Sequence, residues 1–228
     1  PTVFTLRDVF ESVFAAAGAS LDDHVVMRRA DTLARHAWAG DRRLDLFSDV
    51  DRSAEAIGDF AGAEEARRFR AFCARARRVY ATLDRPFMRS APAGVLGLVG
   101  RVGLAGLPDL ARIAPFTSLW RALGDHFHDP RLRQLFGRYA TYCGSSPFLA
   151  PATLMLVAHV EQEGVWLVEG GMHRLAQALA DVTARSGGIL RYGVAATEVC
   201  VDGGRVAGVD LATGERLEAD TVVVNADV

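Results

Sequence analysis

The chain has 228 residues, of which 50% are hydrophobic and 24% are charged, so it is long enough to bury a core and ordinary for a globular protein. Its 26 basic and 28 acidic residues leave a formal charge of −2, which gives no global field that favours nucleic acid or another polyanion. Every basic residue is arginine, which excludes chemistry that needs a lysine amine, such as Schiff-base catalysis or a P-loop.

The cysteines and the two ends of the chain indicate its context. Cys73, Cys143 and Cys200 lie far apart without a C-x-x-C pair, which argues against a zinc ribbon or a disulfide framework and favours a reducing cytoplasm. No charged-then-apolar leader is visible. Because the chain opens at Pro1 without Met and stops after a strand-like run at 221–224, we expect an excised segment that is inactive by itself.

The first part of the chain predicts a helix, a hairpin and two further helices. Apolar residues recur at three-and-four spacing over 6–17, the pattern of an amphipathic helix. Short apolar runs within 25–47 surround a tight turn at 39–41 and predict paired strands. Helices are expected near 51–60 and 63–84. The second of these places one set of residues on a single apolar face: Ala66, Phe69, Cys73, Ala76, Tyr80 and Leu83.

Residues 92–108 carry a glycine at every third position among valines and leucines, with Arg101 as their one charge. Each glycine weakens a helix by about 1 kcal/mol relative to alanine, and the segment is shorter than the roughly 20 apolar residues that span a bilayer. It is either a helix packed internally or an apolar flap against lipid. The arginines that crowd the 63–84 helix would then attract anionic head groups, unless they form only a solvated helix face.

The rest of the chain changes from helices to strands. Helices are expected near 118–127, 129–143 and 149–161. After them the pattern predicts a strand, a Gly-Gly turn, a helix over about 172–186 and a series of strands. The expected strands are 165–168, 189–192, 196–201, 206–211 and 221–224.

Several motifs are absent or weak. The sequence holds no G-x-S-x-G and no G-x-G-x-x-G, so it lacks a nucleophile elbow, and a dinucleotide pyrophosphate would be bound outside this chain. The run from Asp125 to Asp129 contains two histidines, but residues two apart do not share a helix face. We expect a capped helix end before Pro130 there, and no metal site. His159 and Glu163, one turn apart, predict a structural pair.

The order of elements from Gly164 to Asp227 resembles the second flavin-domain segment of the phytoene desaturase and amine oxidase superfamily. The resemblance rests on the turn at Gly170–Gly171, the stretch 192–199, the following Gly-Gly hairpin and the final run 219–227. Residues 1–5 also look like the family's Gly-Pro-Thr-Val stretch, and Val165-Trp166 like its Gly-Val-Trp. The likeness covers nearly the whole chain, weakly in the helical middle.

The resemblance implies an α+β or α/β fold, in which a partial FAD-binding domain of the glutathione-reductase-like type joins a substrate domain of helices and sheet. Residues 1–24 would be a remnant of the FAD-binding domain and a lead-in helix, 25–162 a substrate and membrane-contacting domain, and 163–228 the second FAD-binding segment. FAD is the implied cofactor. The implied cofactor-binding residues are Ala196, Gly170, Gly171, Asn225, Ala226 and Asp227; for the two glycines, fold maintenance is an equal alternative.

The turn sequence Leu167–His173 departs from the aromatic-Pro-x-Gly-Gly-Thr of phytoene desaturases and looks closer to bacterial 1-hydroxycarotenoid 3,4-desaturases, also called methoxyneurosporene dehydrogenases. Val102 and Ala105 stand where some phytoene desaturases carry Asp and Arg, so we assign no catalytic acid or base. A long polyene needs an apolar tunnel, for which the candidate lining is Phe87, Leu96, Leu98, Phe116, Trp120, Phe148 and Met155. His173 is the candidate partner for a substrate hydroxyl, or simply faces solvent.

By resemblance, therefore, the chain belongs to a bacterial enzyme that desaturates a carotenoid, with a cytoplasmic location peripherally associated with the inner or photosynthetic membrane. Its partners would be the carotenoid and a lipid surface, and not nucleic acid. The alternatives are a phytoene desaturase, a flavin amine oxidase or a non-catalytic lipid-binding module. Against an amine oxidase, the only aromatic residues after position 150 are Trp166 and Tyr192, too few for an obvious aromatic cage.

Overall fold

The structure is a computed structural model that describes residues 4–91, 97, 100–103, 108, 113 and 116–226. The chain divides into two compact units, Pro1–Ala178 and Leu179–Val228. The apolar glycine-rich segment expected at 92–108 lies mostly outside the described residues, as do Pro1–Val3 and Asp227.

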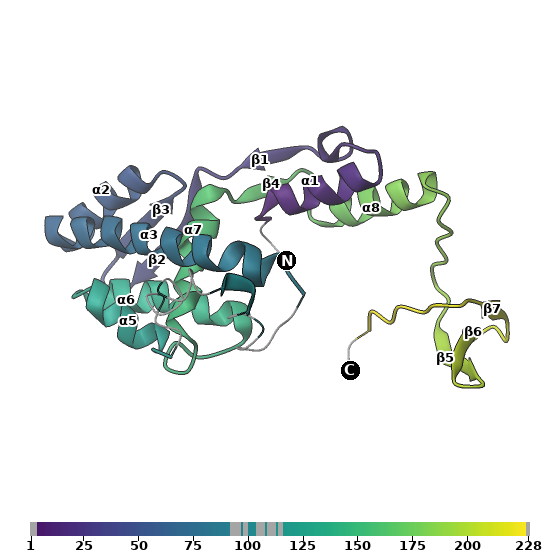
Figure 1. Ribbon diagram of the computed structural model, residues 1–228. Coiled ribbons are helices and arrows are strands. Elements are labelled where there is room, and N and C mark those ends of the chain that lie inside the picture. Colours follow the sequence, from purple (N-terminus) through teal and green to yellow (C-terminus); the bar gives the residue numbers. More distant parts are fainter. Residues whose placement is uncertain are drawn as a thin grey trace. The chain divides into compact units, whose positions relative to one another are not determined.

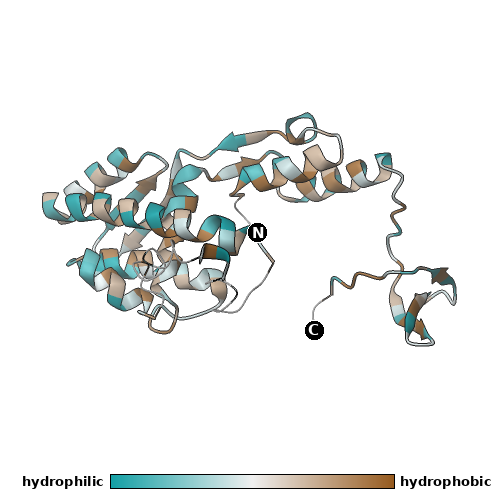
Figure 2. Cartoon of the chain, in the orientation of Figure 1, coloured by the Kyte–Doolittle hydropathy of each residue, from teal (hydrophilic) through white to brown (hydrophobic). Residues whose placement is uncertain are grey.

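The first unit is built around one long helix. Helix α3 (Ala63–Leu83) contacts α2 (Val50–Ala61), α5 (Leu119–His126) and α7 (Leu156–Glu163), while α5 also contacts α6 (Pro130–Gly137). All six residues predicted to share the apolar face of α3 are buried. Hydrophilic and hydrophobic residues alternate around α3, as its amphipathic sequence requires (Figure 2).

Short helical turns complete the helical part. The helix expected at 129–143 is α6 followed by a tighter 3₁₀ turn, η3 (Arg138–Cys143), and the helix expected at 149–161 is η4 (Ala152–Met155) running into α7. Such 3₁₀ turns are frequent at helix ends. A π-helical turn, η2 (Asp84–Met88), extends α3.

Aromatic rings fill the centre of this unit. The ring of Phe72 lies 5.2 Å from that of Phe127 and 4.9 Å from that of Phe136, and the latter two stack at 4.9 Å. All three are nearly inaccessible to solvent. Full burial of one phenylalanine contributes roughly 1.5–3 kcal/mol, so this contact between α3 and α6 is a main source of stability.

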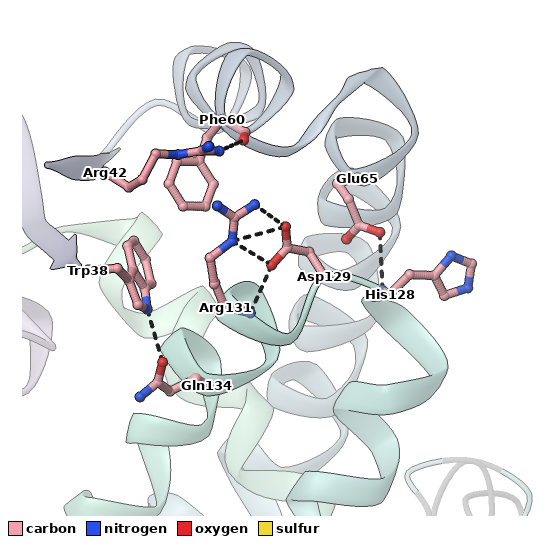
Figure 3. Close-up of polar contacts among 8 residues, drawn as sticks. All are labelled: Trp38, Arg42, Phe60, Glu65, His128, Asp129, Arg131 and Gln134. Carbon is pink, nitrogen blue, oxygen red and sulfur yellow. Dashed lines mark hydrogen bonds and ion pairs between the residues drawn. The ribbon is translucent and has the colours of Figure 1, made fainter. Parts of the chain in front are cut away.

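A hairpin of β2 (Thr32–Trp38) and β3 (Arg42–Phe47) packs on α2, as the turn at 39–41 predicts. Figure 3 shows how its tip is fixed: Arg42 and Arg131 both place their guanidinium groups over the ring of Phe60, at 5.1 and 4.2 Å. The helix expected to end before Pro130 is α5, and Asp129 accepts the Arg131 backbone N–H at 2.8 Å and so caps the start of α6. Trp38 donates to Gln134 at 2.9 Å.

A short strand connects this helical core to the candidate site. Strand β4 (Trp166–Val168) pairs antiparallel with β1 (Met27–Arg29), and its Trp166 also exchanges two backbone hydrogen bonds with Phe4, at 2.8 and 3.2 Å. Helix α1 (Arg7–Ala16) follows Phe4, and the 3₁₀ turn η1 (Leu21–Asp23) precedes β1 (Figure 1). Hydrogen bonds at Trp166 therefore join the N-terminal stretch at Phe4 to strand β4, and both segments carry part of the family likeness.

Helix α8 (His173–Arg185) leads into the second unit, whose sheet is β5 (Ala196–Asp202), β6 (Arg205–Leu211) and β7 (Arg216–Glu218). The predicted Gly-Gly hairpin is present, with Gly203 and Gly204 between β5 and β6. The predictions of strands at 189–192 and 221–224 are wrong, since neither segment is a strand. A strand exists only through pairing with a neighbour, and the described part of the chain offers neither segment one, whereas β7, too short to predict, pairs with β6.

A buried carboxylate ties α7 to η3. Glu161 accepts hydrogen bonds from Arg138 Nη2 at 2.8 Å, from the Tyr139 hydroxyl at 3.1 Å and from the Tyr142 hydroxyl at 3.2 Å. Burial, together with the charge of Glu161, raises the pKa of Tyr139 well above its usual range, so its hydroxyl stays protonated and donates. The buried charge of Glu161 is therefore paired and hydrogen-bonded.

This network predicts different costs for two neighbouring glutamates. Glu161→Ala leaves the half-buried Arg138 without its carboxylate and should lower the free energy of unfolding by about 3 kcal/mol. The matched change Glu163→Ala removes only a partly exposed pair with His159 and should cost less than about 0.5 kcal/mol. Urea denaturation of the full-length protein measures both, and equal costs would show that the network does not stabilise the fold.

Candidate functional site

The turn between β4 and α8 has the backbone geometry that glycine alone adopts easily. Gly170 and Gly171 have φ angles of +77° and +85°. The Gly171 N–H donates to the Val168 carbonyl at 3.0 Å, and its own carbonyl accepts the Arg174 N–H at 3.0 Å. No atom lies within 4 Å of the place where a Cβ on Gly171 would stand. The backbone is therefore open to close approach by another molecule at this point.

His173, the candidate partner for a substrate hydroxyl, is the first residue of α8 and is exposed. Its ring is accessible, directly after the Gly170–Gly171 turn. Leu175 and Val182 on the same helix are buried, so α8 presents an apolar face as its sequence predicts.

Ala196 begins the edge strand β5. The Ala212 N–H donates to the Ala195 carbonyl at 2.9 Å, and Ala196 is paired with Leu211. Because hydrogen-bonded and non-hydrogen-bonded pairs alternate in an antiparallel ladder, the backbone N–H and C=O of Ala196 point to the outer edge. Asn225 and Ala226 are exposed and outside any strand, and Asp227 is not among the described residues.

The residues proposed to line an apolar tunnel are placed unevenly. Phe87 is 52% exposed in η2 and Phe116 is 92% exposed. Trp120 and Phe148 contact each other, with ring centroids 5.0 Å apart, and Phe148 is 61% exposed. Met155 is fully buried in the helical core. Leu96 and Leu98 lie outside the described residues.

One cavity among the described residues was not anticipated from the sequence. It has a volume of about 870 Å³ and lies where α3, η2 and α7 meet. Its wall includes Tyr80, His159 and Glu163. Three arginines from separate segments also contribute to it: Arg77, Arg85 and Arg101. In the sequence, helical spacing places Arg77 on the surface of a helix, and Arg101 is the one charge in an apolar segment. Neither pattern predicts that these arginines line a cavity. Their placement in one wall depends on the path of the chain after α3, through the π-helical turn η2, which the sequence pattern does not predict.

His159 and Glu163 form the pair that their spacing predicts, with 3.3 Å between Nε2 and Oε1. The imidazole also packs edge-on against Tyr80, with ring centroids 4.9 Å apart. Burial lowers the pKa of His159, so the ring is mainly neutral at pH 7. Among the described residues no group of three or more His, Cys, Asp or Glu side chains could hold a metal ion.

Comparison with known proteins assigns the chain to a family. The model of the family described as flavin containing amine oxidoreductase matches residues 110–228, more than half of the chain. The chain belongs to this family. Its mixture of helices and strands is compatible with the family's flavin-binding type of domain, and the expected FAD agrees with the cofactor in the family's description.

Curated relatives refine the likeness. The chain is 53% identical to a hydroxyneurosporene desaturase of Rubrivivax gelatinosus and 45% identical to one of Cereibacter sphaeroides, in both cases over 100% of its length. It is 33% identical to a phytoene dehydrogenase of Streptomyces griseus, also over 100% of its length. The chain spans 44%, 46% and 44% of these three relatives, which is less than half of each.

Proposed function

We propose that the full-length protein containing this chain is an FAD-dependent desaturase that removes two hydrogens from adjacent carbons of a carotenoid. We propose further that it acts at the 3,4 position of a 1-hydroxy- or methoxyneurosporene-type substrate. One observation carries both statements: identity to hydroxyneurosporene desaturases is 53% and 45% along the whole chain, against 33% to a phytoene dehydrogenase.

The chain's residues fit a part of the FAD site. In this proposal the open backbone at Gly171 and the outward N–H and C=O of Ala196 approach the cofactor, and Asn225, Ala226 and Asp227 lie near it. Residues 163–228 would then form the second FAD-binding segment, following a remnant of that domain at 1–24. When bound, FAD supplies the acceptor for the hydride that leaves the substrate.

The substrate is proposed to contact the middle of the chain, residues 25–162. A polyene offers almost no hydrogen bonds, so its binding depends on apolar contact. Phe87, Phe116 and Phe148 are large apolar side chains already exposed in the structure, which supports their role, with Trp120 packed behind Phe148. Leu96, Leu98 and Met155 complete the proposed lining. His173 is proposed to meet the single hydroxyl, since leaving that group unpaired would cost roughly 1–3 kcal/mol.

A carotenoid dissolves in lipid, and we propose that the protein collects it while bound peripherally to the cytoplasmic face of the inner or photosynthetic membrane. The exposed apolar side chains near Phe116 and Phe148 and the many arginines support such binding. Among the described residues no helix combines the length and the apolar character needed to cross a membrane.

A direct assay tests the reaction and the substrate separately. Purified full-length protein with bound FAD is incubated with 1-hydroxyneurosporene and, in a separate vessel, with phytoene. We expect the hydroxylated carotenoid to lose two hydrogens, seen by absorbance and mass, at a rate well above that of phytoene. Desaturation of phytoene alone would refute the proposed substrate. No desaturation of either compound by flavin-loaded protein would refute the reaction.

A matched pair of glycine substitutions tests the cofactor contact. Gly171 and Gly214 have φ angles of +85° and +84°, and neither has a neighbour within 4 Å of an added Cβ. Changing either to alanine should therefore cost a similar 1–2 kcal/mol or so of backbone strain. Only Gly171→Ala places a methyl group where the flavin is proposed to approach, so we expect it to lower the flavin content of the purified protein.

Gly214→Ala, in the turn between β6 and β7, should keep the wild-type flavin content. The bound flavin is measured by absorbance after denaturation, and the unfolding midpoint checks that the two variants are equally stable. Equal flavin content in the two variants would contradict a role for Gly171 in cofactor binding.

A further inference from the structure

Three arginines and two acids line the cavity of about 870 Å³ described above. Its arginines come from α3 (Arg77), from η2 (Arg85) and from the helical residues 100–103 (Arg101). Ligand cavities in proteins commonly have volumes of about 300–1,000 Å³, so this one is large enough for a small organic group and much larger than a lone ion needs.

The acids in the wall are already engaged. Asp84 pairs with Arg89 at 2.7 Å, and Glu163 pairs with His159 at 3.3 Å. Among the described residues no carboxylate lies within 4 Å of the guanidinium groups of Arg77 or Arg85, which therefore lack an ion-pair partner there.

Arg101 is held by neutral groups. Its Nη1 donates to the backbone carbonyls of Pro86 at 3.1 Å and Ala91 at 2.7 Å. These bonds fix the side chain at the wall without neutralising its charge. The guanidinium keeps further N–H groups that a ligand can use.

The remaining polar groups also suit an anion. Burial lowers the pKa of His159, and the positive charge of Arg77 lowers it further although Glu163 opposes this. The Tyr80 hydroxyl accepts a hydrogen bond from Arg89 at 3.4 Å, which leaves its own proton available.

We propose that this cavity binds a phosphate ester. Planar guanidinium groups bind phosphate oxygens through paired hydrogen bonds, and three of them from different segments can surround one such group. The cavity size favours a phosphate with a glycerol-sized substituent. The head group of a phospholipid and a soluble phosphate ester share this chemistry. The site shares the η2 turn with the exposed Phe87, so a phosphate bound there would anchor the protein next to that side chain.

The test uses full-length protein with bound FAD and two probes. Cosedimentation with vesicles of phosphatidylglycerol and phosphatidylcholine measures the lipid-borne phosphate, and calorimetric titration with sn-glycerol 3-phosphate measures the soluble one. The double variant Arg77→Gln with Arg85→Gln removes the two unpaired cations. The matched control, Arg78→Gln with Arg121→Gln, makes the same change of charge at two exposed arginines outside the cavity wall.

We expect the cavity variant to bind at least one probe about tenfold more weakly or worse, because charge-assisted hydrogen bonds are lost, while the control stays within about twofold of wild type. If the cavity variant loses binding to vesicles alone, the ligand is a lipid head group. If it loses binding to both probes, the cavity is a general site for phosphate esters. Equal weakening of the two variants, or no binding of either probe by wild type, would overturn the proposal. Thermal unfolding midpoints confirm that both variants are folded.

Discussion

Helix α3 has one apolar face, and the packing of that face determines where the other helices of the first unit lie. Phe72 at its centre contacts Phe127 and Phe136, while Cys73 and Ala76 leave room for neighbouring helices to come close. The opposite surface carries arginines, of which Arg67, Arg70, Arg77 and Arg78 are exposed. A helix with such a division has a single orientation in which its apolar area is removed from solvent, so α2, α5 and α7 are arranged around it.

This packing also positions the candidate site. Helix α7 is fixed to the core by Val157 and Ala158 and by the Glu161 network, and only two residues separate its end from β4. Strand β4 is in turn held on both edges, by β1 and by Phe4. The Gly170–Gly171 turn follows directly, so its open backbone projects from a supported strand. The arginine-lined cavity depends on the same packing, because α3 and α7 provide six of its twelve wall residues.

Helices and hairpins were predictable because their signals are local. The apolar spacing of α3, the turn at 39–41 and the Asp129 cap each depend on residues a few positions apart, and all three are present. The strands expected at 189–192 and 221–224 are absent because pairing depends on a partner that apolar composition does not specify. The cavity escaped prediction for a related reason: Arg77, Arg85 and Arg101 belong to three segments that share one wall only in the folded chain. Conversely, the Gly170–Gly171 turn was predictable from its paired glycines, and both have the positive φ angles that favour glycine.

The central proposal is that the open backbone of the Gly170–Gly171 turn contacts the flavin. A crystal structure of the full-length protein with bound FAD tests it most directly. The proposal predicts that Gly171 lies in van der Waals or hydrogen-bond contact with the bound FAD. FAD bound without contact to Gly171 would contradict it.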